Sequence, residues 1–276
     1  MEKLDRLGWA EGLTFSAFGV CLGVRVNASG VLDRVLPLLP PGWKAVRGAA
    51  VQRLYSLVVG GGCERNGVRR LNLLYSNSTR LARETALEQL VEAFKADHHL
   101  YIASVSAKMT FLHAGVVGWQ GRAVVTPGPS FSGKTTLIRE MLRLGATYYS
   151  DEYAVIDNVG RVHPFARPLG IRAQGSVGQI DCTAEKLGAT TGVEPLPIGT
   201  VVISGYKAGA RWQPNPLSKA HGALELLANS VAIRNQPGRT LFRLHKLAKH
   251  ADFICGMRGE ARDAAASILN NLVRTG

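Results

Sequence analysis

The feature that most constrains this chain is a glycine-rich loop at residues 128–136, which lies between an apolar run and an amphipathic one. It consists of Gly128, Pro129, Ser130, Phe131, Ser132, Gly133, Lys134, Thr135 and Thr136, and it satisfies the pattern G-x-x-x-x-G-K-[ST]. Residues 122–126 have the pattern of a short buried strand, and apolar residues at helical spacing follow the loop as far as Gly145. The sequence therefore predicts a strand, a phosphate-binding loop and a helix.

These residue types suit the binding of phosphate. Glycines let the chain turn tightly, so that successive backbone N–H groups converge, and the N-terminus of the following helix adds partial positive charge. In this pattern Lys134 reaches the outer phosphates of a nucleotide, and the Thr135 hydroxyl binds Mg²⁺. We therefore expect nucleotide binding across residues 128–136.

Two carboxylates, Asp151 and Glu152, follow the predicted helix and separate two predicted strands. If the first of these strands runs parallel to the strand at 122–126, a right-handed crossover brings both carboxyl ends to one edge of the sheet. The two acids would then open beside the bound phosphates, where one can ligate Mg²⁺ and another can accept a proton from an attacking hydroxyl. The alternative is that these two residues form an acidic turn with no catalytic or metal-binding role.

Two further sets of residues could contribute to a site. Arg167 is enclosed by prolines, and the limited backbone freedom suits a cation that must point at a phosphate, although a structural arginine is equally open. The sequence also predicts a helix over residues 79–96, with Asp97, His98 and His99 at its end. Because nothing nearby completes a set of metal ligands, we expect these histidines to lie at the end of the helix without binding a metal.

Composition limits the class of protein. The chain has 276 residues, of which 46% are hydrophobic, enough for one large domain or two modest ones. Acids lie near its start, and no uninterrupted apolar run approaches the length that spans a membrane, so we expect a cytoplasmic protein with no membrane partner. The four cysteines are far apart without metal-ligand spacing, which predicts reduced thiols.

The formal net charge is +13, and the excess of basic residues is spread along the chain. It is densest in the last fifth, at Arg234, Arg239, Arg243, Lys246, Lys249, Arg258 and Arg262. Such a surface favours an anionic partner, for example an acidic peptide, and a solvated basic helix face is the alternative. Aromatic residues are not interleaved with these bases, which argues against nucleic acid as a partner.

Four segments together resemble a known family. They are residues 112–117, which include His113, the loop at 128–135, the carboxylate pair, and residues 165–171. They resemble the HPr kinase/phosphorylase group, and more closely its small relatives, the HPr-kinase-like serine kinases of peptide-modification pathways such as those of lasso peptides. The resemblance covers roughly residues 98–276. It implies an α/β fold, with a P-loop kinase domain of the HPr kinase C-terminal type at 98–276 and a smaller N-terminal α/β domain at 1–97.

Members of this group transfer phosphate from ATP to a serine hydroxyl of a peptide or small protein. The resemblance implies ATP and Mg²⁺ as cofactors, Asp151 as the general base, and catalytic roles for Arg167 and His113. It assigns the metal to Thr135 and Glu152. A P-loop ATPase, or a nucleotide-binding regulatory protein without kinase activity, is the alternative.

Two positions depart from the family pattern. Phe131 occupies a position where the loop usually has glycine, so a backbone conformation that is easy for glycine is in question there. Phe165 replaces the acid that HPr kinase proper carries two positions before the arginine, which weakens the transfer of phosphorylase activity. The assembly state cannot be transferred either, and a homo-oligomer stays open.

Overall fold

The computed structural model describes residues 2–60, 71–129, 132–172 and 179–274. The chain divides into two units, Met1–Ala107 and Lys108–Gly276, and both contain helices and sheet. The boundary expected after residue 97 is wrong, because it falls inside a helix, α3 (Leu87–Val105), that belongs wholly to the first unit. No helix among the described residues is both long and apolar enough to cross a membrane.

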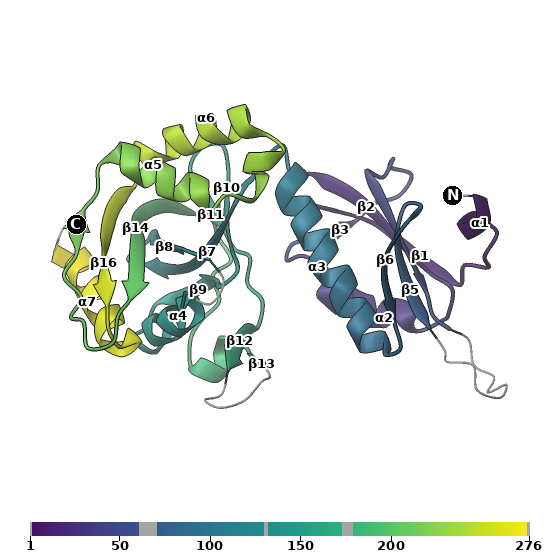
Figure 1. Cartoon of the computed structure of the whole chain (residues 1–276), viewed down its shortest axis with the longest axis horizontal. Helices are drawn as coiled ribbons and strands as arrows, with labels where there is room; N and C mark the ends of the chain where they lie inside the picture. The colour runs from purple at the N-terminus through teal and green to yellow at the C-terminus, as the bar shows by residue number, and fades with distance from the viewer. Residues whose placement is uncertain (1, 61–70, 130–131, 173–178, 275–276) are drawn as a thin grey trace. The chain divides into compact units, whose positions relative to one another are not determined.

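The first unit is built on one six-stranded sheet. Its elements are α1 (Glu2–Asp5), β1 (Glu11–Ala17), β2 (Val20–Val26), α2 (Val31–Val35), η1 (Leu36–Leu38), β3 (Lys44–Ala45), β4 (Arg53–Val58), β5 (Asn72–Ser76), β6 (Thr79–Glu84) and α3. The strand order is β3-β1-β2-β4-β5-β6, in which only β2 and β4 pair in parallel. The long helix α3 packs on β5 and β6 (Figure 1).

The helix expected over 79–96 is therefore wrong in its first part. Thr79–Glu84 is a strand that pairs antiparallel with β5 across a tight turn, in which Asn77 adopts a left-handed conformation with φ of 51°. An asparagine tolerates this conformation better than most residues, and the turn directs the chain into a hairpin. The helix begins only at Leu87, and Asp97, His98 and His99 lie within it.

The histidine pair of α3 is also not at a helix terminus. Both side chains are buried, and the His98 ring stacks on Phe94 with a centroid distance of 4.4 Å. His98 Nδ1 lies 2.7 Å from the carbonyl oxygen of Phe94. These contacts make the two histidines part of the core of the first unit.

The second unit carries the loop. Its elements are β7 (Thr110–Trp119), β8 (Arg122–Pro127), α4 (Lys134–Arg143), β9 (Thr147–Ser150), β10 (Tyr153–Ile156), β11 (Arg161–His163), β12 (Leu169–Arg172), β13 (Gln179–Cys182), η2 (Glu185–Leu187), β14 (Leu196–Tyr206), β15 (Asn215–Pro216), α5 (Lys219–Ala228), η3 (Val231–Arg234), α6 (Pro237–Ala248), β16 (Asp252–Arg258) and α7 (Ala261–Arg274). Eight strands form a sheet in the order β11-β10-β7-β8-β14-β16-β15, and β9 also pairs with β7.

Helices cover both faces of this sheet (Figure 1). One apolar core contains Leu226 of α5 and Leu244 and Leu247 of α6, and the other contains Leu137 of α4 and Ile268 of α7. The unit thus has three layers, and its burial of apolar side chains on both faces is the main source of its stability. The amphipathic pattern after the loop correctly predicted α4.

A β-hairpin leads into the loop. Strands β7 and β8 pair antiparallel from Ala114↔Pro127 to Trp119↔Arg122. Gln120 and Gly121 form the two-residue turn with φ of 49° and 75°, the left-handed values that a tight hairpin of this kind needs. The end of β8 leads directly into the loop.

Strand directions bring several chain segments to one edge of the sheet. β14 is parallel to β8 on one side and to β16 on the other. Both β8 and β9 pair antiparallel with β7, so β9 runs in the same direction as β8. The carboxyl ends of β8, β9, β14 and β16 therefore point the same way, as in open sheets that bind ligands at this edge.

Tyr55 offers a test of the first unit, because its hydroxyl donates to Asp97 Oδ2 at 2.6 Å in the interior. We expect Tyr55→Phe to lower the free energy of unfolding by about 1–2 kcal/mol, since one donor to a part-buried carboxylate is lost while Arg53 remains. Tyr75→Phe is the matched control, because its hydroxyl has no partner among the described residues. Equal losses in urea denaturation would contradict a role for the Asp97 contact.

Candidate functional site

The loop is held between β8 and α4 by backbone contacts. The Gly128 N–H donates to the His113 carbonyl oxygen at 3.2 Å, which ties the start of the loop to β7. Gly133 caps α4 with φ of 81°, a left-handed conformation that suits glycine. Ser130 and Phe131 lie outside the described residues, so the expected effect of Phe131 on the backbone of the loop stays a prediction.

Lys134 is folded over its own loop. Its Nζ donates to the carbonyl oxygens of Gly128 at 2.7 Å and Pro129 at 2.6 Å. An ammonium has three donors, so these two contacts leave one for a ligand. Burial lowers the pKa of Lys134, and the charge of Asp151 opposes that shift. The lysine is thus close enough to the acidic turn for their charges to interact.

Arg258 braces the loop from the end of β16. Its side chain is buried, and Nη2 donates to the carbonyl oxygens of Ser132 at 3.1 Å and Gly133 at 3.2 Å. In a trans peptide the C=O and N–H groups point in opposite directions. The N–H groups of Gly133 and Lys134 therefore point away from Arg258, and they stand at the start of α4, where N–H groups lack partners within the helix.

The two carboxylates sit in the short gap between β9 and β10. Ser150 Oγ accepts from the N–H groups of Glu152 at 3.1 Å and Tyr153 at 3.0 Å, so this serine fixes the turn. The Ala114 N–H of β7 donates to the Glu152 carbonyl oxygen at 3.3 Å. The turn is consequently held on β7 opposite the point where β8 ends.

Asp151 joins the turn to the first residues of α4. Its Oδ2 accepts from Thr135 Oγ1 at 3.3 Å, and its Oδ1 accepts from the Tyr148 hydroxyl at 3.0 Å. Burial raises the pKa of Asp151, although the hydrogen bonds from Tyr148 and Thr135 and the charge of Arg167 act in the opposite direction. The site thus contains a largely buried carboxylate beside the hydroxyl predicted to bind metal.

Glu152 points to a different partner. Its Oε2 accepts from Arg167 Nη1 at 3.1 Å. The single proton of the Tyr148 hydroxyl is shared between Asp151 Oδ1 and the Arg167 carbonyl oxygen, which lies 2.7 Å from the hydroxyl oxygen. Burial raises the pKa of Tyr148, and the charge and hydrogen bonding of Asp151 add to that shift, so its hydroxyl stays protonated as a donor. Tyr148 therefore links the acidic turn with the segment that carries Arg167.

His113 lies on β7 beside the lysine. Its exposed ring packs on Tyr153 with a centroid distance of 5.1 Å. Partial burial lowers its pKa, and the charge of Lys134 adds to the shift, which favours a neutral imidazole. Phe165, the departure noted before Arg167, is buried against Phe111 and Tyr153 and belongs to an aromatic cluster rather than to a set of ligands.

The structure thus brings together most of the residues predicted from the sequence. His113, Lys134, Thr135, Asp151, Glu152 and Arg167 form one connected group of contacts and charges. Thr136 is exposed on the first turn of α4, and Pro129 is exposed in the loop. Among the described residues, no group of three or more His, Cys, Asp or Glu side chains could hold a metal ion.

Sequence reasoning missed Tyr148 and Arg258. Arg258 is the last residue of an apolar strand and precedes a glycine, which is the position where parallel strands deliver side chains to the ligand edge of a sheet. That pattern could have singled it out from the other basic residues. Nothing in the sequence around Tyr148 distinguishes it from a core tyrosine.

The chain matches no protein-family model and no curated protein. Among solved structures it is similar to the HPr(Ser) kinase/phosphatase from Coxiella burnetii, with 13% identity, coverage of 60% of this chain and 88% of that chain, and a TM-score of 0.33. A likeness at this TM-score carries no argument about activity. The resemblance drawn from the motifs therefore stays a prediction, and the contacts described above carry the functional argument.

Gly133 tests the brace formed by Arg258. A Cβ at Gly133 would collide with Arg258 Nη2, whereas Gly145, at the other end of α4 with φ of 93°, has open space around it. Both Gly→Ala substitutions put alanine in a left-handed conformation, so we expect Gly133→Ala to lower the unfolding free energy by about 1–3 kcal/mol more than Gly145→Ala.

A double-mutant cycle with Arg258→Ala completes that test. In the Arg258→Ala background, Gly133→Ala should no longer lower the unfolding free energy by the additional amount attributed to the guanidinium. Urea denaturation measures the unfolding free energy of all four proteins in the cycle. If Gly133→Ala and Gly145→Ala have equal effects in the original background, Arg258 does not brace the loop.

The raised pKa of Asp151 predicts a pH-dependent effect of Asp151→Asn on stability. Because the folded state holds the proton more tightly than the unfolded state, ionisation destabilises the fold as pH rises through and above the ordinary carboxyl pKa. We expect Asp151→Asn to be more stable than the parent near about pH 7, with a difference that shrinks near about pH 5. The control is Asp263→Asn on the exposed face of α7, and a difference independent of pH would contradict the argument.

Proposed function

We propose that this protein is a phosphotransferase that binds Mg²⁺-ATP at residues 128–136 and transfers the γ-phosphate to a serine hydroxyl of a peptide or small protein. The observation that carries the proposal is the contact of 3.3 Å between Thr135 Oγ1 and Asp151 Oδ2. It joins the phosphate-binding motif to a partly buried carboxylate, so nucleotide and proton acceptor would share one edge of the sheet. A nucleotide-binding loop alone would not need that carboxylate.

Three features support binding of the nucleotide phosphates. The N–H groups of Gly133 and Lys134 point away from Arg258, as its contacts with the loop carbonyls require. They stand at the positive end of the α4 dipole. Lys134 Nζ, held over the loop, would add a point charge for the outer phosphates.

Thr135 provides a hydroxyl oxygen that fits Mg²⁺, and Glu152 was expected to provide a carboxylate. Hydroxyl and carboxylate oxygens are hard ligands, and protein sites for this ion use few side chains together with phosphate oxygens and water. When bound, the ion would neutralise charge on the phosphates. In the structure the Glu152 carboxylate pairs with Arg167, so a metal contact at Glu152 would require this ion pair to open, and the Asp151 carboxylate is assigned to the proton rather than to the metal.

The remaining residues have roles that follow from their positions. Burial makes Asp151 a stronger base than an exposed aspartate, which suits acceptance of a proton from the attacking hydroxyl. Arg167, held beside the acids by Glu152, would stabilise charge on the transferred group. Partial burial and the charge of Lys134 lower the pKa of His113, so it would serve the site as a neutral hydrogen-bonding group. The net charge of +13 favours an acidic acceptor.

The test is transfer of label from γ-labelled ATP to candidate serine-containing acidic peptides. We expect Asp151→Asn to lower the transfer rate about 100- to 10,000-fold while nucleotide affinity changes little, because the proton acceptor is lost but the loop is intact. Asp263→Asn, an exposed carboxylate substitution on α7, should leave the rate unchanged.

The same assay separates the alternatives. Steady loss of ATP without any acceptor would indicate an ATPase, and nucleotide binding without either reaction would indicate a regulatory protein. Unchanged transfer in Asp151→Asn would refute the proposed catalytic role of Asp151.

A further inference from the structure

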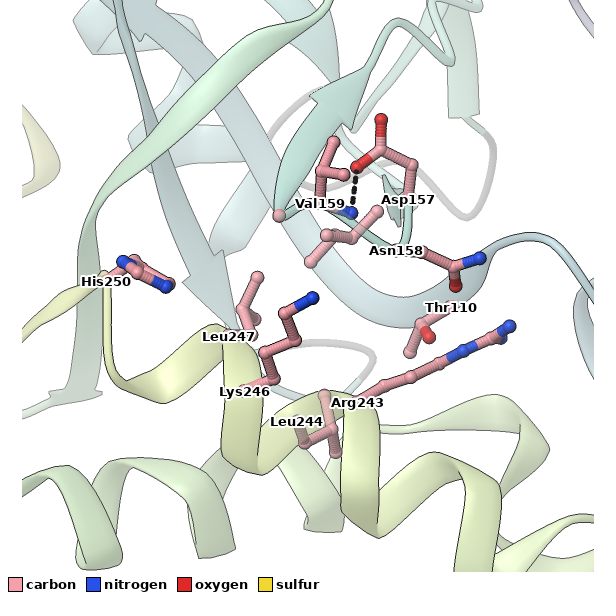
Figure 2. Close-up of a pocket in the computed structure, with 11 residues that line it drawn as sticks. Thr110, Asp157, Asn158, Val159, Arg243, Leu244, Lys246, Leu247 and His250 are labelled. Carbon is pink, nitrogen blue, oxygen red and sulfur yellow. Dashed lines mark hydrogen bonds between the residues drawn. The ribbon is translucent and has the colours of Figure 1, made fainter.

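A pocket lies in the loop-bearing unit, away from the candidate site. Figure 2 shows it between the turn at residues 157–160, which follows β10, and the C-terminal half of α6, with Thr110 of β7 at one side. The acidic turn that carries Asp151 precedes β10, whereas this pocket opens beyond its other end. The two places are therefore distinct, and the inference below does not depend on phosphoryl transfer.

The charged side chains of the pocket come mainly from α6 and the residues after it. Figure 2 shows Lys246 reaching from α6 toward the turn, Arg243 extending on the side of Thr110, and His250 at the opposite end. Lys246 has no ion-pair partner among the described residues. Arg243 Nη1 donates to the Met109 carbonyl oxygen at 3.3 Å, which is a neutral acceptor. Burial lowers the pKa of Arg243, and the charge of Arg239 adds to the shift, so an anion on the pocket side of the guanidinium would be favourable.

The acid of the pocket is already engaged. Asp157 Oδ2 lies 2.9 Å from His163 Nε2, and Oδ1 accepts from the N–H groups of Val159 and Arg161 at 2.9 Å each. Although burial alone would raise the pKa of Asp157, these hydrogen bonds hold it below its ordinary value. This carboxylate therefore faces its own turn and His163 rather than Lys246, which leaves the lining with an excess of positive charge.

The rest of the lining is apolar. The side chains of Ile156, Leu244 and Leu247 are buried, and they form the inner part of the pocket. Val159 is 70% exposed at the rim, in the same turn that Lys246 approaches. A ligand that covered Val159 would remove apolar surface from water while its charge met the cations.

The backbone of the turn decides between anions. A phosphate site usually offers several unoccupied N–H groups. Here the N–H groups of Val159 and Arg161 donate to Asp157 Oδ1, and that of Gly160 donates to the Asp157 carbonyl oxygen. An anion in the pocket would consequently depend on the side chains and at most on the N–H of Asn158, which suits the single charge of a carboxylate better than a phosphate.

We propose that this pocket binds a carboxylate attached to an apolar group, with the carboxylate at Lys246 and Arg243 and the apolar group against Leu247 and Val159. The carboxylate can belong to a small organic acid or to the C-terminus of a peptide that ends in an apolar residue. Both sources share the same chemistry, and the probes below distinguish them.

Binding to the full chain is measured by calorimetry with N-acetyl-leucine, N-acetyl-leucinamide, inorganic phosphate, and a leucine-terminated peptide with a free or an amidated C-terminus. We expect N-acetyl-leucine to bind at least about tenfold more tightly than its amide, because the amide cannot pair with the cations. Tighter binding of the free-acid peptide than of N-acetyl-leucine would assign the pocket to peptide C-termini, and the reverse order to small acids.

Two exposed side chains allow substitution without disturbing the core. Lys246→Ala should weaken N-acetyl-leucine binding about tenfold, whereas Lys249→Ala, an exposed lysine just after α6 that does not line the pocket, should not. Val159→Ser should weaken binding without changing the preference for acid over amide. Equal binding of acid and amide, tighter binding of phosphate, or equal effects at Lys246 and Lys249 would overturn the proposal.

Discussion

The site depends on the contacts of the Asp151 carboxylate, which is largely withdrawn from water. A charged group in the interior is stable only when donors surround it, and here the donors come from two directions, the Tyr148 hydroxyl from β9 and the Thr135 hydroxyl from α4. Each hydrogen bond lowers the energy of the buried charge and at the same time fixes one element to the next. Because withdrawing the Asp151 charge from water is unfavourable without these hydrogen bonds, the loop and the acidic turn keep one relative position.

That arrangement is available because of the directions of the strands. The strands β8, β9 and β16 end at the same edge of the sheet, so whatever follows each of them is delivered to one place. β8 delivers the loop, β9 delivers Asp151, and β16 ends at Arg258. Groups that are far apart in the sequence therefore meet without any long connection, and the layers of helices on both faces hold the sheet that aligns them.

The sequence predicted the parts of this site that have local patterns. The loop and α4 are encoded by glycine spacing and helical periodicity, and both of these act over a few residues. Tyr148 and Arg258 were missed because their roles come from contacts across the sheet, which no local pattern records. The same limit explains the error over residues 79–96. The turn at the left-handed Asn77 leads residues 79–84 into pairing with β5, although their sequence looks helical.

The positive charges at the loop are balanced within the described residues mainly by carbonyl dipoles. Lys134 donates to two loop carbonyls, and Arg258 donates to two others, so each cation is solvated by the loop itself. Burial lowers the pKa of both side chains, which means that this solvation is poorer than that of water. An anion bound at the loop would supply the negative charge that the carbonyl dipoles do not provide. The loop is therefore a place where positive charge is assembled at a free-energy cost, and binding of a polyphosphate is the event that would offset it.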